Sequence, residues 1–282
     1  STLGNQVYNA SANLAGDTTL EGNSLSVSKV DGQTKNLVLN FAQTTSLDGS
    51  FANITDLTSE GDVSLNGTIT TLGNQVYNAS ASLVGDTTLE GSSLSVANVD
   101  GETKNLVLNF AQTTSLDGSF ANIADLTSEG DVSLNGSIST SGDQTYKADT
   151  ILSGDTNIVT SGGDVTITGG TGGIYSVEVL PAGIGYNLSI AAGAGNIIVG
   201  NETGFGDKNG TAALVNNLSL SSSTSTKVGS GNQVISGDMN VPGGPLTLLG
   251  DALLGGTSLM TPAGVDGAGH NLNLAFTEQT TI

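Results

Sequence analysis

The chain has 282 residues, of which 41 are Gly, 4 are Pro, none is Cys or Trp, and 36% are hydrophobic. A chain of this length and apolar content can bury a sizeable core, so we expect it to fold. Its 26 Asp and Glu residues oppose only 6 Lys residues, which gives a net charge of −20. Such a polyanion repels nucleic acid, because contacts to phosphates need cations. The sequence also lacks a run of about 18 apolar residues, so we predict no transmembrane segment.

The first residues, STLGNQVYNA, lack the charged and apolar regions of a signal peptide. We therefore expect any such segment to have been removed or to lie outside this stretch.

The strongest signal is an internal repeat. Residues 2–70 and 71–139 are identical at 60 of 69 positions. A third copy begins within TSGDQTYKADTILSGDT, which contains Gly142, and a fourth begins at Gly231. A fixed period of this kind indicates a repeat architecture. We predict one continuous domain over 1–282, with repeat 3 at 140–230 carrying one inserted coil and a partial repeat 4 at 231–282.

Each copy of the repeat contains a short phrase of Leu, then an acid or Asn, then Gly, three times. In the first copy the phrase begins at Leu20, Leu47 and Leu65, and it returns at Leu89. Gly permits the positive φ that a tight corner needs. We interpret each phrase as one corner of a coil. Each repeat is thus predicted to hold three coils averaging about 23 residues, enough for two or three short strands and their corners.

Around these phrases the residues alternate as they do in β-strands. Leu37, Leu39 and Phe41 are predicted to share one face, with Val38 and Asn40 on the other. Segments such as GIYSVEVL and YNLSIAAGAGNIIVG continue the pattern. We predict an all-β fold, a right-handed parallel β-helix of about 12 coils. The alternative is a string of small β-sandwiches, which also place short strands between turns.

Several segments resemble a known family. They are TTLGNQVYNASASLVGDTTLEGSSLSV, TSGDQTYKADTILSGDT, LSIAAGAGNIIVGN and VDGAGHNLNL. They resemble the repeat region of filamentous-haemagglutinin-like bacterial surface adhesins of the two-partner-secretion and autotransporter type. The resemblance covers most of the chain and implies a right-handed parallel β-helix on a bacterial surface, acting as a stalk or adhesive fibre. The Asn-Pro-Asn-Gly signature of that family's secretion domain is absent from this sequence, so the match is to the repetitive shaft.

Acids at the predicted corners are the candidate metal ligands. Stacked up one edge, with Asn66 and Asn135 in every third place, their oxygen atoms could hold Ca²⁺. The alternative, which we prefer, is a solvated corner where Asn reduces repulsion between stacked acids. No metal site or cofactor is therefore firmly predicted. The candidate calcium ladder comprises Glu21, Asp48, Glu90 and Asp117.

Other repeated residues favour structural roles. Carboxylates that follow Gly can cap backbone N–H groups at turns, and those in question belong to Asp17, Asp62, Asp86, Asp131 and Asp155. Aromatic residues that recur at the period are either core or an exposed row that binds sugar, and core is the simpler interpretation. These aromatic residues are Tyr8, Tyr77, Tyr146, Phe41, Phe110 and Phe276.

The sequence offers little for catalysis. His270 is the only His, and the chain has neither a Cys nucleophile nor an Arg to stabilise an oxyanion. We predict that the chain is not an enzyme.

Two functions remain. The first is the structural shaft of a large secreted bacterial surface adhesin, which holds a recognition tip away from the cell. The second is a self-assembling extracellular filament or sheath whose coils stack end to end. The predicted partners are other copies or further repeats of the same protein, or a host or neighbouring-cell surface. The predicted location is secreted, extracellular or at the bacterial cell surface.

Overall fold

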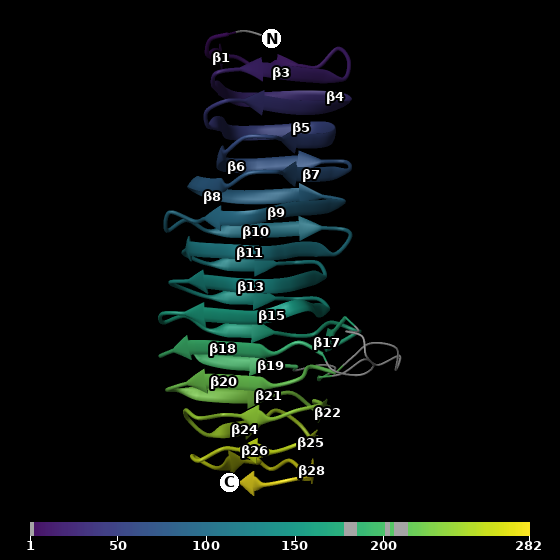
Figure 1. The fold of residues 1–282 in the computed structure, drawn as a ribbon, viewed down its shortest axis with the longest axis vertical. Helices are drawn as coiled ribbons and strands as arrows, with labels where there is room; N and C mark the ends of the chain where they lie inside the picture. Colours follow the sequence, from purple (N-terminus) through teal and green to yellow (C-terminus); the bar gives the residue numbers. More distant parts are fainter. Residues whose placement is uncertain (1–2, 178–184, 201–203, 206–213) are drawn as a thin grey trace. The chain divides into compact units, whose positions relative to one another are not determined.

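The structure, a computed structural model, describes residues 3–177, 185–200, 204–205 and 214–282. Within these ranges there is no helix, and the strands stack in parallel as a right-handed β-solenoid of about 13 turns in total. The predicted fold class is therefore confirmed. The chain divides into two compact units, unit 1 (Ser1–Gly130) and unit 2 (Asp131–Ile282). Each consists of strands laid one above the next (Figure 1).

The strands of unit 1 are β1 (Gln6–Tyr8), β2 (Ala12–Asn13), β3 (Thr18–Gly22), β4 (Leu25–Phe41), β5 (Thr45–Ser59), β6 (Val63–Thr71), β7 (Asn74–Tyr77), β8 (Ala81–Gly91), β9 (Ser93–Asp100), β10 (Leu106–Phe110), β11 (Thr114–Ile123) and β12 (Leu126–Ser128). Those of unit 2 are β13 (Val132–Thr140), β14 (Gln144–Tyr146), β15 (Thr150–Thr160), β16 (Val165–Ile167), β17 (Ile174–Ser176), β18 (Leu188–Gly193), β19 (Asn196–Val199), β20 (Leu218–Ser222), β21 (Ser225–Val228), β22 (Gly231–Val234), β23 (Met239–Asn240), β24 (Leu246–Leu248), β25 (Ala252–Gly256), β26 (Leu259–Met260), β27 (Val265–Asp266), β28 (Leu272–Phe276) and β29 (Thr280–Thr281).

Unit 1 is a three-sided coil, and each side is a stack of parallel strands. Side A pairs Gln6, Leu25, Thr45, Val63, Ala81, Val99 and Phe120 in turn. Side B pairs Ala12, Val30, Phe51, Ile69, Leu89 and Leu108. Side C pairs Thr18, Leu37, Leu57, Gln75 and Leu94. Successive partners stack at about 4.8 Å, and the coils that join them are of nearly constant length.

One repeat does not contain a whole number of coils. Between Leu25 on side A and its copy Leu94 on side C, the chain passes Val30, Leu37, Thr45, Phe51, Leu57, Val63, Ile69, Gln75, Ala81 and Leu89 in turn. These eleven steps from side to side make three and two-thirds coils. The prediction of three coils per repeat was therefore wrong, and the coils are shorter than expected. The Leu-acid-Gly phrase marks only some corners, and the chain turns the others without it.

The alternating pattern places the core as predicted. Leu37, Leu39 and Phe41 are buried, whereas Asn40 is exposed. Corner glycines also behave largely as expected, since Gly67 has a φ of +85° and a Cβ there would meet the carbonyl oxygen of Gly49. Close approach of successive coils therefore requires Gly at this corner.

Unit 2 uses the same three-sided construction with coils of variable length. A long coil joins Ile158 to its partner Ile190, whereas a much shorter one joins Leu246 to Val265. Between Gln144 and Gln233, which are equivalent positions of repeats 3 and 4, the chain passes Thr150, Thr156, Val165, Ile174, Leu188, Ile197, Phe205, Leu218 and Thr226, which makes ten steps.

The described strands thus make one step fewer than the eleven between Leu25 and Leu94, so they do not contain the inserted coil predicted within 140–230. Of the strand predicted at GIYSVEVL, Ile174–Ser176 forms β17, and residues 178–180 lie outside the described residues.

Candidate functional site: acid and amide ladders

The acids of the candidate calcium ladder lie on three different corners of unit 1. Asp48 follows side A and accepts a hydrogen bond from Asn66 Nδ2 at 2.7 Å. Glu90 follows side B, whereas Glu21 and Asp117 follow side C with four coils between them. The repeat of three and two-thirds coils moves each copy to another side, so the predicted stacking up one edge was wrong. Among the described residues, no group of three or more His, Cys, Asp or Glu could hold a metal ion.

Carboxylates and carboxamides form a different kind of ladder, at the start of side C. The Asn36 N–H donates to Asp17 Oδ1 at 3.0 Å, and the Asp56 N–H donates to Asn36 Oδ1 at 3.3 Å. The Asn74 N–H then donates to Asp56 Oδ1 at 2.7 Å. Each side-chain oxygen thus accepts the backbone N–H one coil further on. Because Asp and Asn alternate, the carboxylates are two coils, about 10 Å, apart, which weakens their repulsion.

A copy of this ladder stands at the start of side B. The Asn105 N–H donates to Asp86 Oδ1 at 2.9 Å, and the Asp125 N–H donates to Asn105 Oδ1 at 3.2 Å. The repeat has therefore carried the ladder of Asp17 to a second side of unit 1.

The acids after Gly do accept bonds from backbone N–H groups, as predicted, but not from the N–H groups of their own turn. Besides Asp17 and Asp86, the acids Asp62, Asp131 and Asp155 accept the N–H groups of Ser80, Asp149 and Asn187 at 3.2, 3.0 and 2.9 Å. Each donor lies one coil further along the chain. Sequence spacing alone did not reveal this.

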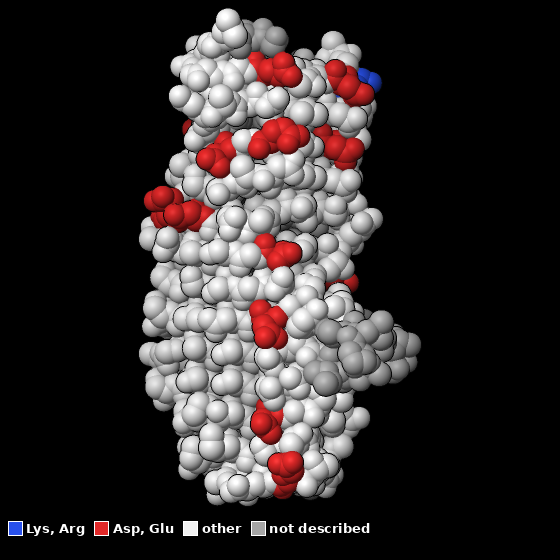
Figure 2. All heavy atoms as spheres, in the orientation of Figure 1, with Lys and Arg blue, Asp and Glu red and all other residues white. Residues whose placement is uncertain are grey.

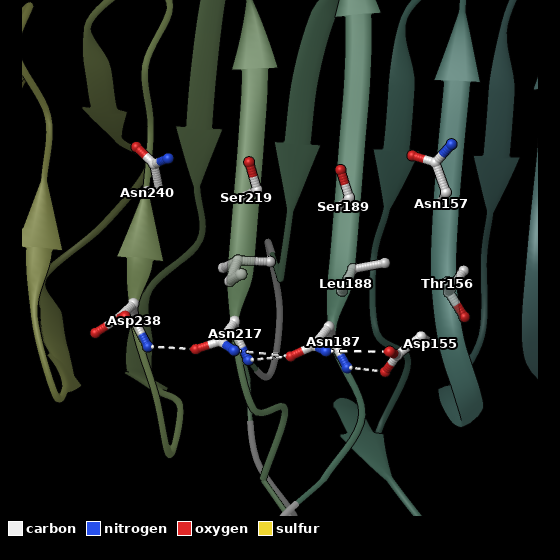
Figure 3. Close-up of a pocket in the computed structure, with 11 residues that line it drawn as sticks. Asp155, Thr156, Asn157, Asn187, Leu188, Ser189, Asn217, Ser219, Asp238 and Asn240 are labelled. Atoms are coloured by element: carbon white, nitrogen blue, oxygen red, sulfur yellow. Dashed lines mark hydrogen bonds between the residues drawn. The ribbon is translucent and has the colours of Figure 1, made fainter.

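The longest ladder among the described residues of unit 2 crosses β15, β18, β20 and β23. Asn187 donates its N–H and Nδ2 to the two oxygens of Asp155, at 2.9 and 3.2 Å. Asn217 Nδ2 donates to Asn187 Oδ1 at 2.9 Å, and the Asp238 N–H donates to Asn217 Oδ1 at 2.9 Å. Ser258 Oγ donates to Asp238 Oδ1 at 2.7 Å. Figure 3 shows the first four of these residues in one line.

A shallow hollow of about 530 Å³ lies beside this ladder, and we name it the ladder groove. It is lined by Asp155, Thr156, Asn157, Asn187, Leu188, Ser189, Asn217, Leu218, Ser219, Asp238 and Asn240. The lining residues comprise carboxylates, carboxamides, hydroxyls and two leucines but no Lys, and the exposed surface of the hollow is mainly apolar. It can therefore both donate and accept hydrogen bonds while disfavouring anions.

Buried Gln and Tyr side chains form pairs in the interior. Tyr77 Oη donates to Gln75 Oε1 at 2.9 Å, and Gln75 Nε2 donates to the carbonyl oxygen of Glu90 at 2.8 Å. Tyr146 and Gln144 form the same pair at 2.9 Å. Burial raises the pKa of Tyr77 and Tyr146 well above the usual range. The Gln-x-Tyr spacing at the period was the available signal, and the sequence analysis missed it.

The predicted core role of the aromatic residues is confirmed for four of them. Tyr77, Tyr146, Phe41 and Phe110 are at most 4% exposed. Tyr8, in the first coil, is 37% exposed, and Phe276 in β28 is partly exposed. Tyr8 and Tyr77 lie on sides A and C of unit 1, so they do not form a row.

His270 lies beside an acid on the surface of unit 2. Its Nδ1 is 3.8 Å from Asp251 Oδ1, and both side chains are well exposed. The backbone N–H and the side chain of Asn271 donate to Asp251, and these bonds hold the pKa of the carboxyl below its usual range. An exposed pair of this kind contributes little to stability.

Acidic side chains are spread over the visible face in Figure 2, and Lys is visible only near the amino-terminal end. In the part of the chain that the structure describes, no helix has the length and apolar character needed to cross a membrane. No protein-family model, curated protein or solved structure matches this chain.

Proposed function

We propose that this chain is the structural shaft of a large secreted bacterial surface adhesin, which holds a recognition tip away from the cell. The observation that carries the proposal is that one nearly identical sequence fits more than one side of the coil. Leu25 and its copy Leu94 lie on sides A and C, yet they are only 2% and 3% exposed. Because the sides are interchangeable, another copy extends the solenoid without a redesign of its neighbours.

Other features fit a shaft. Coil-to-coil ladders satisfy backbone N–H groups along the unit surfaces, and the net charge of −20 favours a solvated surface. The adhesin membership, the bacterial surface location and a host or neighbouring-cell partner rest on the sequence resemblance. We propose no enzymatic activity.

Insertion of one extra copy of residues 71–139 after residue 139 tests the proposal. We expect the longest dimension to grow by about 18 Å, which is three and two-thirds coils at the parallel-strand spacing. Small-angle X-ray scattering and electron microscopy measure it. A control chain carries a flexible Gly-Ser insert of the same length, which gives no defined increment. A particle that widens without lengthening would overturn the shaft.

The second candidate is end-to-end self-assembly into an extracellular filament or sheath. The observation that favours it is that each coil stacks on the next through parallel strand pairs, as Leu254 pairs with Leu274. Electron microscopy over a range of concentrations tests it, with Leu274→Asp as the variant that should stop elongation. Single particles at every concentration would rule this candidate out.

We also propose that the fold needs no resident metal ion. Equal melting temperatures in EDTA and in millimolar Ca²⁺ are expected. A rise that only Ca²⁺ produces would contradict this and would revive the calcium assignment.

A further inference from the structure

Two Asn residues at corners of the coils are each followed by Gly. They are Asn66, before Gly67 in β6, and Asn135, before Gly136 in β13, and a third such Asn, Asn209, lies outside the described residues. The carboxamide of an Asn can react with the backbone nitrogen of the next residue. Gly hinders this attack least, because it has no Cβ. Among the described residues, these two Asn-Gly pairs are therefore the places where the reaction meets the least steric hindrance.

The fold holds the Asn66 side chain from two neighbouring coils. Its Nδ2 donates to Asp48 Oδ1 at 2.7 Å, in the preceding coil. On the other side its carboxamide lies against the backbone of Gly85 in the next coil, where a Cβ would collide with Asn66 Oδ1 and Cγ. Attack by the Gly67 nitrogen draws Cγ toward the backbone, so the carboxamide must leave both contacts before the ring can close.

An equivalent contact covers Asn135 in unit 2. A Cβ on Gly154 would collide with Asn135 Oδ1 and Cγ, as a Cβ on Gly85 would with Asn66. Gly85 and Gly154 each lie at an irregularity in the strand pairing of their unit. Such an irregularity interrupts the ladder of backbone hydrogen bonds, so the coil opens there at a smaller cost than in a regular stack. Local opening of one coil thus frees the carboxamide at both sites.

We propose that Asn66 and Asn135 are modification sites, at which the carboxamide becomes a carboxylate when the next coil opens. The Gly nitrogen gives its proton to a solvent base and bonds to the Asn Cγ, while the bond from Cγ to Nδ2 breaks. Nδ2 takes up a proton from solvent and leaves as ammonia, and the product is a cyclic succinimide. Water then adds to either carbonyl carbon of the ring, which yields Asp or isoaspartate. One amide and one water thus become one acid and one ammonia, without an oxidant or a reductant.

The products change the corner of unit 1 permanently. A carboxylate at Asn66 no longer donates to Asp48 and repels it instead, because the two residues stand opposite each other at about 4.8 Å. Isoaspartate also lengthens the backbone, which shifts Thr68 and Ile69 against their partners in β5. The converted corner cannot close as before, so each conversion leaves a lasting record that the coil has opened. This property goes beyond the role of a shaft.

The test follows the whole chain at mildly alkaline pH by peptide mass spectrometry, which separates Asn, Asp and isoaspartate at each site. We expect conversion at Asn66 and Asn135 to be at least about tenfold slower in the folded chain than in urea, because the folded chain must first open. Asp48→Ala removes one of the two contacts of Asn66. It should speed conversion at Asn66 by about threefold or more, while Asn135 in the same sample keeps its original rate.

The matched control is Asp48→Asn, which keeps an acceptor oxygen for Asn66 Nδ2 and should convert at close to the original rate. Circular dichroism should show both variants folded. Equal rates in the folded and the unfolded chain would overturn the gating by coil opening. Equal acceleration of Asn66 and Asn135 in a folded Asp48→Ala chain would also overturn it, and the absence of conversion in urea would overturn the modification itself.

Discussion

The two units share one construction, and they differ in how strictly they keep the length of the coil. In unit 1 every coil has nearly the same length, whereas in unit 2 a long coil joins Ile158 to Ile190 and a short one joins Leu246 to Val265. Strand pairing nevertheless continues across the long coils. Residues added between strands therefore leave the stacked interior intact.

The ladders show the same difference in detail. Unit 1 alternates Asp and Asn, whereas the ladder of unit 2 runs Asp155, Asn187, Asn217, Asp238 and uses amide-to-amide bonds in the middle. The two neutral rungs place the carboxylates at the ends. In the irregular unit this ladder borders the ladder groove.

The buried Gln–Tyr pairs are shared by both units, and removing them should have the largest effect. Gln75→Ala in unit 1 and Gln144→Ala in unit 2 each leave a cavity and unpaired buried groups, so we expect a loss of about 3–4 kcal/mol. Urea unfolding followed by circular dichroism measures it. Gln6→Ala, in the partly exposed first copy of the motif, should cost less than about 1 kcal/mol. Equal losses in all three variants would show that burial does not set the cost.

The same buried Gln–Tyr pairs should make the free energy of unfolding depend on pH at high pH. The neutral tyrosine is the form held in the fold, and its pKa is raised, so above pH ~10 the unfolded chain releases a proton that the folded chain keeps. Stability is therefore full below pH ~10 and falls by about 1.4 kcal/mol per pH unit for each buried tyrosine above it. Unfolding at pH 9 to 12 checks the slope. Tyr77→Phe and Tyr146→Phe should each remove the part of this slope that one buried tyrosine contributes. Tyr8→Phe should leave the slope unchanged.

The next largest effect should come from adding a carboxylate to a ladder, and it should differ between the two units. Asn105→Asp places a carboxylate between Asp86 and Asp125, so we expect a loss of about 1–2 kcal/mol at neutral pH and low salt. The repulsion needs ionised carboxylates, so the loss should be absent below pH ~4 and appear as pH rises. Thermal unfolding at low and high salt measures the screened part.

Asn217→Asp in unit 2 has only one acidic neighbour, Asp238, and also loses its amide bond to Asn187. Its salt-sensitive loss should be about half that of Asn105→Asp. A larger salt-sensitive loss in unit 2 would contradict the placement of charge in the two ladders.

The sequence was sufficient for the fold class, for the inward face of Leu37 and Leu39, and for the capping role of Asp17. The length of a coil could not be predicted from the sequence. A phrase such as Leu47-Asp48-Gly49 marks one corner, but other corners carry no Gly signal. The hydrogen-bond partners within the ladders and the position of the ladder groove could not be predicted either. Which side chain stands above which depends on the exact length of each coil, and Asn157, Ser189 and Ser219 meet only across two long coils of unequal length.

The smallest effect that tests the shared construction concerns Thr residues inside the coils. The hydroxyls of Thr45 and Thr114 in unit 1 and of Thr150 in unit 2 are buried and have no hydrogen-bond partner among the described residues. Replacement by Val removes an unsatisfied polar atom at almost constant volume, so each variant should gain about 0.5–1 kcal/mol. Thr87→Val is the control, because the Thr87 hydroxyl donates to the carbonyl oxygen of Gly85 at 2.9 Å, and it should instead lose about 1 kcal/mol. Gains at Thr45 and Thr114 but a loss at Thr150 would mean that the two units line their interiors differently.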